Sequence, residues 1–191
     1  TEGVSSMPQN QIKEMKQKTE KTIEHLKGTL LGIRTGRAHP ALVEEIKVDY
    51  FGTMTPIKQM GTVTVPEPRQ LVITPWDKSA LKAIEKAIQS SSLGVTPKTD
   101  GDSVRVVLPE LTKERRQELS KLVNKYAEEA RVAIRNVRRD VLEAFKKMEK
   151  AGEISEDEHK KLQKEVQDHV DGAIKKVDAL AQEKEKEILN D

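Results

Sequence analysis

Three long stretches of the chain carry apolar side chains at steps of three and four residues, the spacing of one face of an α-helix. They run from about Pro8 to Thr35, from Leu111 to Gly152 and from Ser155 toward the end. Each apolar stripe is narrow, so none of these helices is stable alone, and the three together predict a bundle. The predicted seams are Ile12, Met15, Thr19, Ile23, Leu26, Leu30 and Ile33; Leu119, Leu122, Tyr126, Ala130, Ala133, Val137, Val141, Ala144 and Met148; and Leu162, Val166, Val170, Ala173, Val177, Leu180 and Ile188.

Capping signals mark the ends of these helices. Thr112 can serve as the N-cap of the second helix, and Gly152 can take the left-handed conformation that ends it. Ser155 and Glu158 have the spacing of a capping box at the start of the third helix. Gly36 and Pro40 act as stop signals after the first.

The segment between the first two helices has a different character. Seven of the eight prolines fall between Pro40 and Pro109, which excludes a long helix there. Turn signals separate short β-like runs, and one helix, capped by Asp77, interrupts them. The β-like runs are 45–51, 62–65, 71–74 and 103–108, and the buried face of the helix is predicted as Leu81, Ile84, Ala87 and Ile88.

These patterns predict an α+β protein of two domains. Residues 1–36 and 111–191 form an elongated antiparallel three-helix bundle, and residues 37–110 form a small inserted β/α/β sandwich domain. The chain crosses between the domains twice, near 36–40 and 108–111. Two connections between the domains predict a hinge at which the domains can bend relative to one another but cannot tumble independently.

Composition narrows the class of protein. Charged residues make up 35% of the chain and aromatic residues 3%, as expected of long charged helices with a thin core. The absence of cysteine excludes disulfides and thiolate chemistry. No run approaches the ~18 apolar residues of a membrane span, and no signal peptide is recognisable, so we expect no membrane and a cytoplasmic location.

Four arginines cluster on the second helix. Arg131, Arg135, Arg138 and Arg139 are predicted to point away from the core, more than about 100° around the helix from the seam. Guanidinium groups fit phosphate oxygens at two points, so the cluster predicts an RNA-binding face. The alternative is a solvated face whose arginines pair with acids nearby, namely Glu128, Glu129 and Asp140.

Motifs of known catalytic and cofactor chemistry are missing. The sequence has no HExxH zinc pair, no GxxxxGK[ST] phosphate loop and no GxSxG elbow, so we expect no catalytic residue, no metal and no cofactor. The histidines are interpreted as surface residues. Trp76 is predicted to pack between the small sheet and its helix, or else to mark a surface for a partner.

Several segments together resemble the bacterial-type ribosome recycling factor family. They are Ile33–Ala38, Val48–Thr53, Ala83–Ile88, Leu111–Arg116 and Ala130–Asp140. The resemblance covers nearly the whole chain from about Gln11. It implies an L-shaped molecule that acts in protein biosynthesis without being an enzyme.

The resemblance also implies partners and site residues. The bundle would bind large-subunit rRNA of the 70S ribosome through Arg135 and Arg138 first, then Arg131 and Arg139. Elongation factor G, a GTPase, would move the small domain and split the post-termination ribosome, and initiation factor three would keep the subunits apart. The hinge is expected at Arg34, Thr35, Gly36, Arg37, Pro109, Glu110 and Leu111.

A rival interpretation is a structural coiled-coil or chaperone-like helical protein. Such a protein needs a large exposed apolar patch, or seams reserved for association with other chains. The three seams suffice only for burial against one another, so we expect a monomer.

Overall fold

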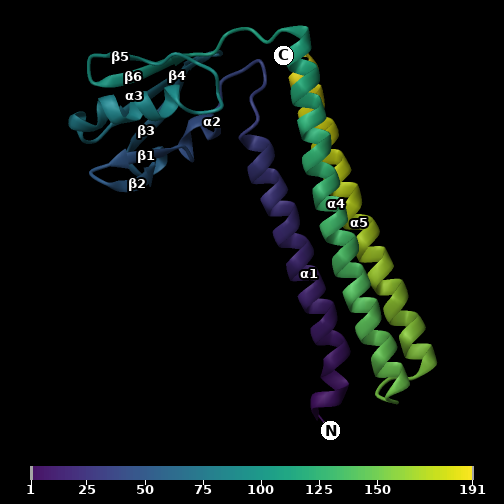
Figure 1. Ribbon diagram of the computed structural model, residues 1–191. Helices are drawn as coiled ribbons and strands as arrows, with labels where there is room; N and C mark the ends of the chain where they lie inside the picture. The colour runs from purple at the N-terminus through teal and green to yellow at the C-terminus, as the bar shows by residue number, and fades with distance from the viewer. Residues whose placement is uncertain (1, 191) are drawn as a thin grey trace. The chain divides into compact units, whose positions relative to one another are not determined.

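The computed structural model describes residues 2–190 and consists of three long helices and a small β-rich domain (Figure 1). The long helices are α1 (Glu2–Leu31), α4 (Lys113–Lys150) and α5 (Glu156–Asn190). Between α1 and α4 the chain forms only short strands, short helices and the loops that connect them. The α+β class expected from the sequence is confirmed.

Contacts divide the chain into two compact units. The first holds the residues up to Thr29 together with Leu122–Lys184, and the second holds Leu30–Lys121 and the chain from Glu185 onward. The second unit therefore includes the ends of the long helices as well as the β-rich part. The domain limits predicted from the sequence, 1–36 with 111–191 and 37–110, stay a prediction.

Helices α1, α4 and α5 lie side by side in the first unit, with α4 antiparallel to the other two (Figure 1). The predicted seam of α1 is buried throughout, including the polar Thr19, which is 1% exposed. The predicted ends of α1 are wrong. Pro8 lies inside the helix, since its fixed φ is close to the helical value and only one N–H is lost. The helix stops at Leu31, next to Gly32.

The seam of α4 differs from the predicted one. Leu122, Tyr126, Ala133, Val137 and Ala144 are only half-buried. Helix α4 faces α1 on one side and α5 on the other, so its buried stripe lies between the two faces. The residues buried instead are Val123, Ala127, Ile134 and Phe145. In α5 the same one-residue shift occurs once, where Ala181 is buried and Leu180 is half-buried.

The predicted caps of α4 and α5 are confirmed. Thr112 Oγ1 accepts a hydrogen bond from Arg115 N at 3.1 Å, and Ser155 Oγ accepts one from Glu158 N at 3.1 Å. Gly152 has a φ of 72°. Glu153 N donates to Met148 O, and Gly152 N donates to Glu149 O. This pair of bonds is a Schellman motif, which reverses the chain between the two helices.

The second unit contains two antiparallel sheets. Strand β1 (Lys47–Tyr50) pairs with β2 (Thr53–Pro56). The larger sheet has the order β3-β4-β6-β5. Its strands are β3 (Gly61–Glu67), β4 (Gln70–Pro75), β5 (Lys98–Asp100) and β6 (Ser103–Val107). Short helices α2 (Ala41–Glu44), η1 (Ile57–Gln59) and η2 (Lys78–Ala80), and the longer α3 (Leu81–Gln89), complete it.

The apolar core of this unit lies between α3 and the sheets. Ile84 and Ile88 of α3 are fully buried, while Leu81 and Ala87 pack against the core from its edge. Asp77 caps the helical segment as predicted, although it caps η2, where its carboxylate accepts from Ser79 N. Other fully buried members are Val43, Val48, Ile57, Leu71, Ile73, Val104, Val106 and Leu108.

Three predictions for this segment are wrong. Strands β2 and β5 are not among the predicted runs, because β2 ends in proline and every residue of β5 is exposed. Strand β3 runs through Pro66, which an edge strand with a bulge between Thr64 and Glu67 can hold. Trp76 does not pack between sheet and helix, since it is 70% exposed.

Candidate nucleic-acid interface

The four clustered arginines of α4, Arg131, Arg135, Arg138 and Arg139, do not share one environment. Counting about 100° per residue, the buried stripe of α4 centres about 80° from Arg131 and about 60° from Arg138. These two side chains are half-buried at the border with α5, whereas Arg135 and Arg139 are exposed. The prediction that all four point away from the core is therefore wrong for Arg131 and Arg138.

Arg131 connects α4 to α5. Its Nε and Nη2 both lie 2.8 Å from Asp178 Oδ1, and its Nη1 lies 3.0 Å from Glu128 Oε2. Burial lowers the pKa of Arg131, but the bonds to Asp178 and Glu128 outweigh burial and raise it. Both carboxylates hold the guanidinium in a fixed direction across the helix border.

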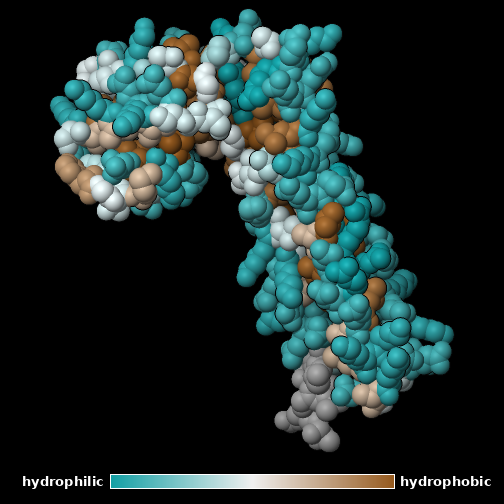
Figure 2. All heavy atoms as spheres, viewed as in Figure 1, coloured by the Kyte–Doolittle hydropathy of each residue, from teal (hydrophilic) through white to brown (hydrophobic). Residues whose placement is uncertain are grey.

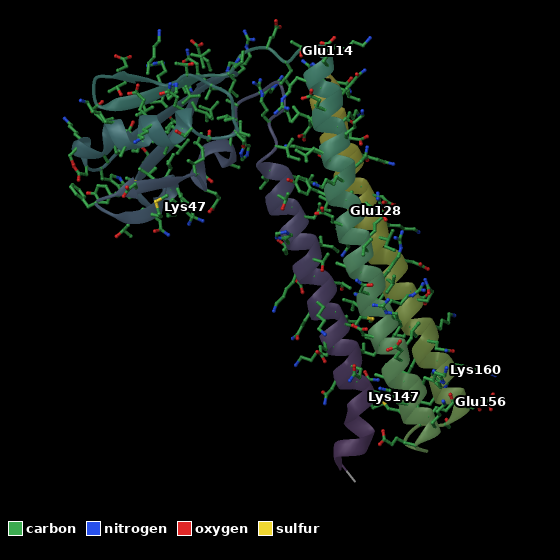
Figure 3. All side chains as sticks on the ribbon, viewed as in Figure 1. Lys47, Glu114, Glu128, Lys147, Glu156 and Lys160 are labelled. Atoms are coloured by element: carbon green, nitrogen blue, oxygen red, sulfur yellow. The ribbon has the colours of Figure 1, made fainter. Side chains whose placement is uncertain are left out.

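Glu128 also binds Arg135, with Nη1 of the arginine 3.2 Å from Oε1. The two carboxylate oxygens thus serve two arginines, and these hydrogen bonds lower the pKa of Glu128. The predicted pairing with acids is confirmed for Glu128, which Figure 3 labels halfway along α4. Glu129 and Asp140 have no recorded ion pair within residues 2–190.

Arg138 is held by a neutral partner. Its Nη1 donates to Gln167 Oε1 at 3.2 Å, and Gln167 Nε2 in turn donates to Asp171 Oδ1 at 2.8 Å. The amide of Gln167 is thereby fixed in one orientation, with its oxygen toward the arginine. No carboxylate bonds to Arg138 directly in the described chain, so no ion pair neutralises its guanidinium there.

Arg139 is the most available of the four cations. It is exposed, and no hydrogen bond or ion pair is recorded for it among the described residues. Val132, 45% exposed, lies about 20° around the helix from it.

The two crossing segments are tied together inside the second unit. Arg34 is buried, and its Nη2 donates to Pro109 O at 2.6 Å. Burial, followed by the charges of Arg115, Arg116 and Arg69, lowers the pKa of Arg34. The turn between β3 and β4 holds both segments, since Ala38 N donates to Pro68 O and Leu108 N donates to Arg69 O.

The remaining predicted hinge residues lie along these segments. Thr35 is buried, and its Oγ1 accepts from Arg37 N at 3.2 Å. Gly36 and Leu111 are half-buried, while Pro109 and Glu110 are exposed. The structure brings these residues together at one place, and their bending stays a prediction.

His159 and His169, which were interpreted as surface residues rather than ligands, are half-buried. His169 Nε2 lies 2.7 Å from Thr19 Oγ1, and burial, then Lys16 and Lys176, lower the pKa of His169. His159 Nδ1 contacts Glu149 Oε2, and its side chain is 12% exposed. Within residues 2–190 no three potential ligands cluster as a metal site would require.

Figure 2 shows that polar residues cover most of the visible face of the long helices. In the part of the chain that is described, no helix is both long and apolar enough to span a membrane.

Sequence reasoning missed the residues of α5 that contact the arginines. Asp178, Gln167 and Asp171 are ordinary polar residues on a charged helix, and no local pattern marks them. Only the packing of α5 on α4 brings them to Arg131 and Arg138.

Comparison with known proteins gives a consistent result. The family model described as Ribosome recycling factor matches residues 26–189. The ribosome-recycling factor of Geobacillus thermodenitrificans is 50% identical over 183 residues, which cover 96% of this chain and 99% of that protein. The one from Clostridioides difficile is 52% identical over 177 residues, covering 93% and 96%.

Two solved structures are similar along nearly the whole chain. A solution structure of the ribosome recycling factor has a TM-score of 0.77 and 46% identity, covering 96% of this chain and 98% of its own. The second belongs to models of the T. thermophilus ribosome recycling factor and E. coli elongation factor G bound to the E. coli post-termination complex. Its TM-score is 0.68 at 48% identity, covering 96% and 99%.

Proposed function

Because the chain belongs to the ribosome recycling factor family, we propose that it promotes disassembly of the post-termination ribosome together with elongation factor G and GTP. The observation that carries this proposal is similarity over nearly the full length to recycling factors, one of them placed on the post-termination complex with elongation factor G. The products are ribosomal subunits released from mRNA.

We further propose that the protein is held on the 70S ribosome by large-subunit rRNA, through the arginines of α4. Arg139 is exposed and makes no bond in the described chain, Arg138 has no acid bonded to it, and the exposed Arg135 shares the single carboxylate of Glu128 with Arg131. These three therefore offer charge to phosphates. Arg131 is bonded to both Asp178 and Glu128, and in this proposal it contributes mainly by holding α4 against α5. This proposal ranks Arg139 with Arg135 and Arg138 as an RNA contact, whereas the sequence-based order placed Arg135 and Arg138 first and Arg131 and Arg139 after them.

The crossing segments act as the hinge in this proposal. Arg34 joins them through Pro109 O, and the β3–β4 turn binds each of them once. Such a connection permits bending of both segments together but resists separation of one from the other. Elongation factor G supplies the push and hydrolyses GTP, so the protein itself needs no catalytic residue and works in the cytoplasm. Initiation factor three then keeps the subunits apart.

A polysome-breakdown assay tests the activity directly. Polysomes stripped of nascent chains are incubated with elongation factor G and GTP, with and without this protein, and sedimented. We expect polysomes to convert to subunits only when protein, elongation factor G and GTP are all present. Conversion that does not depend on this protein contradicts the proposal.

The proposed RNA contact is tested by Arg139→Glu. Charge reversal at an exposed position should weaken co-sedimentation with large subunits and leave helicity unchanged, because the side chain makes no internal bond in the described structure. Lys13→Glu, an exposed charge reversal on α1, is the matched control. Equal loss of binding in the two variants would mean that only net charge matters.

A further inference from the structure

An open groove lies between α4 and α5 beyond Arg138. Its volume is about 260 Å³, and it is lined by Arg138, Arg139, Leu142, Glu143, Lys146, His159 and Gln163. The lining therefore carries three cations against one carboxylate. Neither Arg139 nor Lys146 has a recorded ion pair within residues 2–190, so their charge is directed to solvent or to a ligand.

Two polar atoms of the groove lack a partner. Arg138 Nε and His159 Nε2 are both buried and make no hydrogen bond, and only one other buried side-chain atom of the described chain shares this condition. A buried polar group without a hydrogen-bond partner is energetically unfavourable. A polar ligand bound in this cationic groove would give both atoms a hydrogen-bond partner.

Neighbouring bonds keep both unsatisfied side chains in place. Gln167, oriented by Asp171, holds Arg138 through Nη1, while Nε of the same guanidinium makes no hydrogen bond. Glu149 of α4 contacts His159 Nδ1 on α5, which leaves Nε2 on the other side of the ring. The two anchored groups thus come from different helices and border the same groove.

We propose that this groove binds one segment of RNA backbone, with Lys146 and His159 as ligand-contacting residues in addition to the arginines. Arg138 Nε–H, Arg139 and Lys146 meet the phosphate. A ribose 2′-hydroxyl both donates and accepts, so it satisfies His159 Nε2 in either protonation state of the ring. RNA supplies phosphate and 2′-hydroxyl side by side, which a free phosphate does not. The inference rests on the proposed function and extends the RNA contact toward the end of α4.

Two adjacent lysines provide a matched test. Lys146 lines the groove, whereas Lys147, labelled in Figure 3, does not, and both are exposed residues of α4. Lys146→Gln and Lys147→Gln remove the same charge from the same turn. Affinity of the full-length protein for vacant large ribosomal subunits is measured from low to moderate salt, and circular dichroism checks the fold of each variant.

The expected result is a difference in salt dependence. Loss of one phosphate contact reduces the slope of log affinity against log salt concentration by about one unit. We expect this change for Lys146→Gln and an unchanged slope for Lys147→Gln. If wild-type protein binds but the two variants have equal slopes, the groove is not a backbone site while the proposed function stands. If wild-type protein fails to bind subunits at low salt, the proposed function itself is overturned.

Discussion

The surroundings of Arg131, Arg135, Arg138 and Arg139 follow from their angles around α4. Arg131 lies at the border with α5, where it binds Asp178. Arg139 points outward and makes no hydrogen bond or ion pair in the described chain. Residues of one type, eight positions apart, therefore serve different purposes. A partly buried arginine stabilises the bundle, and an exposed one can bind a partner.

Arg131→Ala should reduce stability more than Arg135→Ala does. Arg131 is 22% exposed and bonded to two carboxylates, whereas Arg135 is 51% exposed and bonded to one. We expect Arg131→Ala to lower the free energy of unfolding by about 1 kcal/mol, and Arg135→Ala to change it by less than about 0.5 kcal/mol. Urea unfolding followed by circular dichroism measures both. Equal losses would argue against the Asp178 bond as a stabilising contact.

The free energy of unfolding should fall as the pH drops below neutrality, in part because of His169. Its pKa is lowered in the fold by burial, then by Lys16 and Lys176, from an ordinary value near 6.5. The unfolded chain therefore takes up the proton first. This contribution is fully present above the ordinary value and is lost as the pH falls through the folded value.

His169→Gln should remove that part of the pH dependence. Urea unfolding at pH 7.5 and pH 5.5 gives the loss of stability for wild type and variant, and these pH values are roughly one unit either side of the ordinary pKa. His25→Gln, an exposed histidine of α1, serves as the control and should keep the wild-type loss. A loss in His169→Gln as large as in wild type would exclude the role of His169.

At the scale of elements, the reversal between α4 and α5 depends on one backbone conformation. Gly152 has a positive φ, and two hydrogen bonds close the end of α4 around it. A Cβ at this position would meet no atom within 4 Å. The cost of a side chain there is therefore a backbone cost alone.

Two glycine-to-alanine changes should have opposite signs. Gly152→Ala forces an L-residue into the left-handed region and should lower the free energy of unfolding by about 1–2 kcal/mol. Gly172→Ala lies inside α5, where an added Cβ also meets nothing, and should raise it by up to about 1 kcal/mol. Thermal unfolding compares the two. A gain from Gly152→Ala would contradict the assigned conformation.

At the scale of the whole molecule, the chain passes twice between the helices and the β-rich part. Arg34, buried on the first pass, bonds to Pro109 on the second. The β3–β4 turn adds one hydrogen bond to each pass. We therefore expect motion at one segment to involve the other.

Arg34→Leu should loosen both segments at once. Loss of a buried hydrogen bond from a charged group costs about 1.5–3 kcal/mol. We expect faster amide hydrogen exchange in residues 31–40 and 108–112, and slower polysome breakdown. Arg37→Leu, which removes an exposed arginine of the same segment, should leave exchange near wild type. Faster exchange confined to the first segment would disprove the coupling through Pro109.

The rival view of a coiled-coil assembly protein makes a different prediction about mass. The helical seams are buried within the chain, so we expect a monomer of 21.5 kDa at micromolar concentration. Static light scattering measures this directly. A stable dimer would favour the rival.

The sequence by itself determined the three long helices and the caps of α4 and α5, because these depend on local chemistry. The stripe of α1, the caps at Thr112, Ser155 and Gly152, and the confinement of proline to the middle of the chain each act within a few residues. The resemblance to the ribosome recycling factor family also rested on short local segments of the sequence. Helix ends near Pro8 and Thr35 were wrong, since a proline or glycine signal is weak where packing favours another end.

Tertiary structure alone decided which side of α4 is buried and what each arginine touches. Apolar residues occupy a broad arc of α4, so the helix could have turned its stripe by one residue, and packing against two neighbours selected Val123, Ile134 and Phe145. Helix α5 then brought Asp178 and Gln167 to the arginines from more than forty and nearly thirty residues away. Contacts between residues so far apart in the chain leave no periodic trace in either helix, and for this physical reason the sequence could not reveal them.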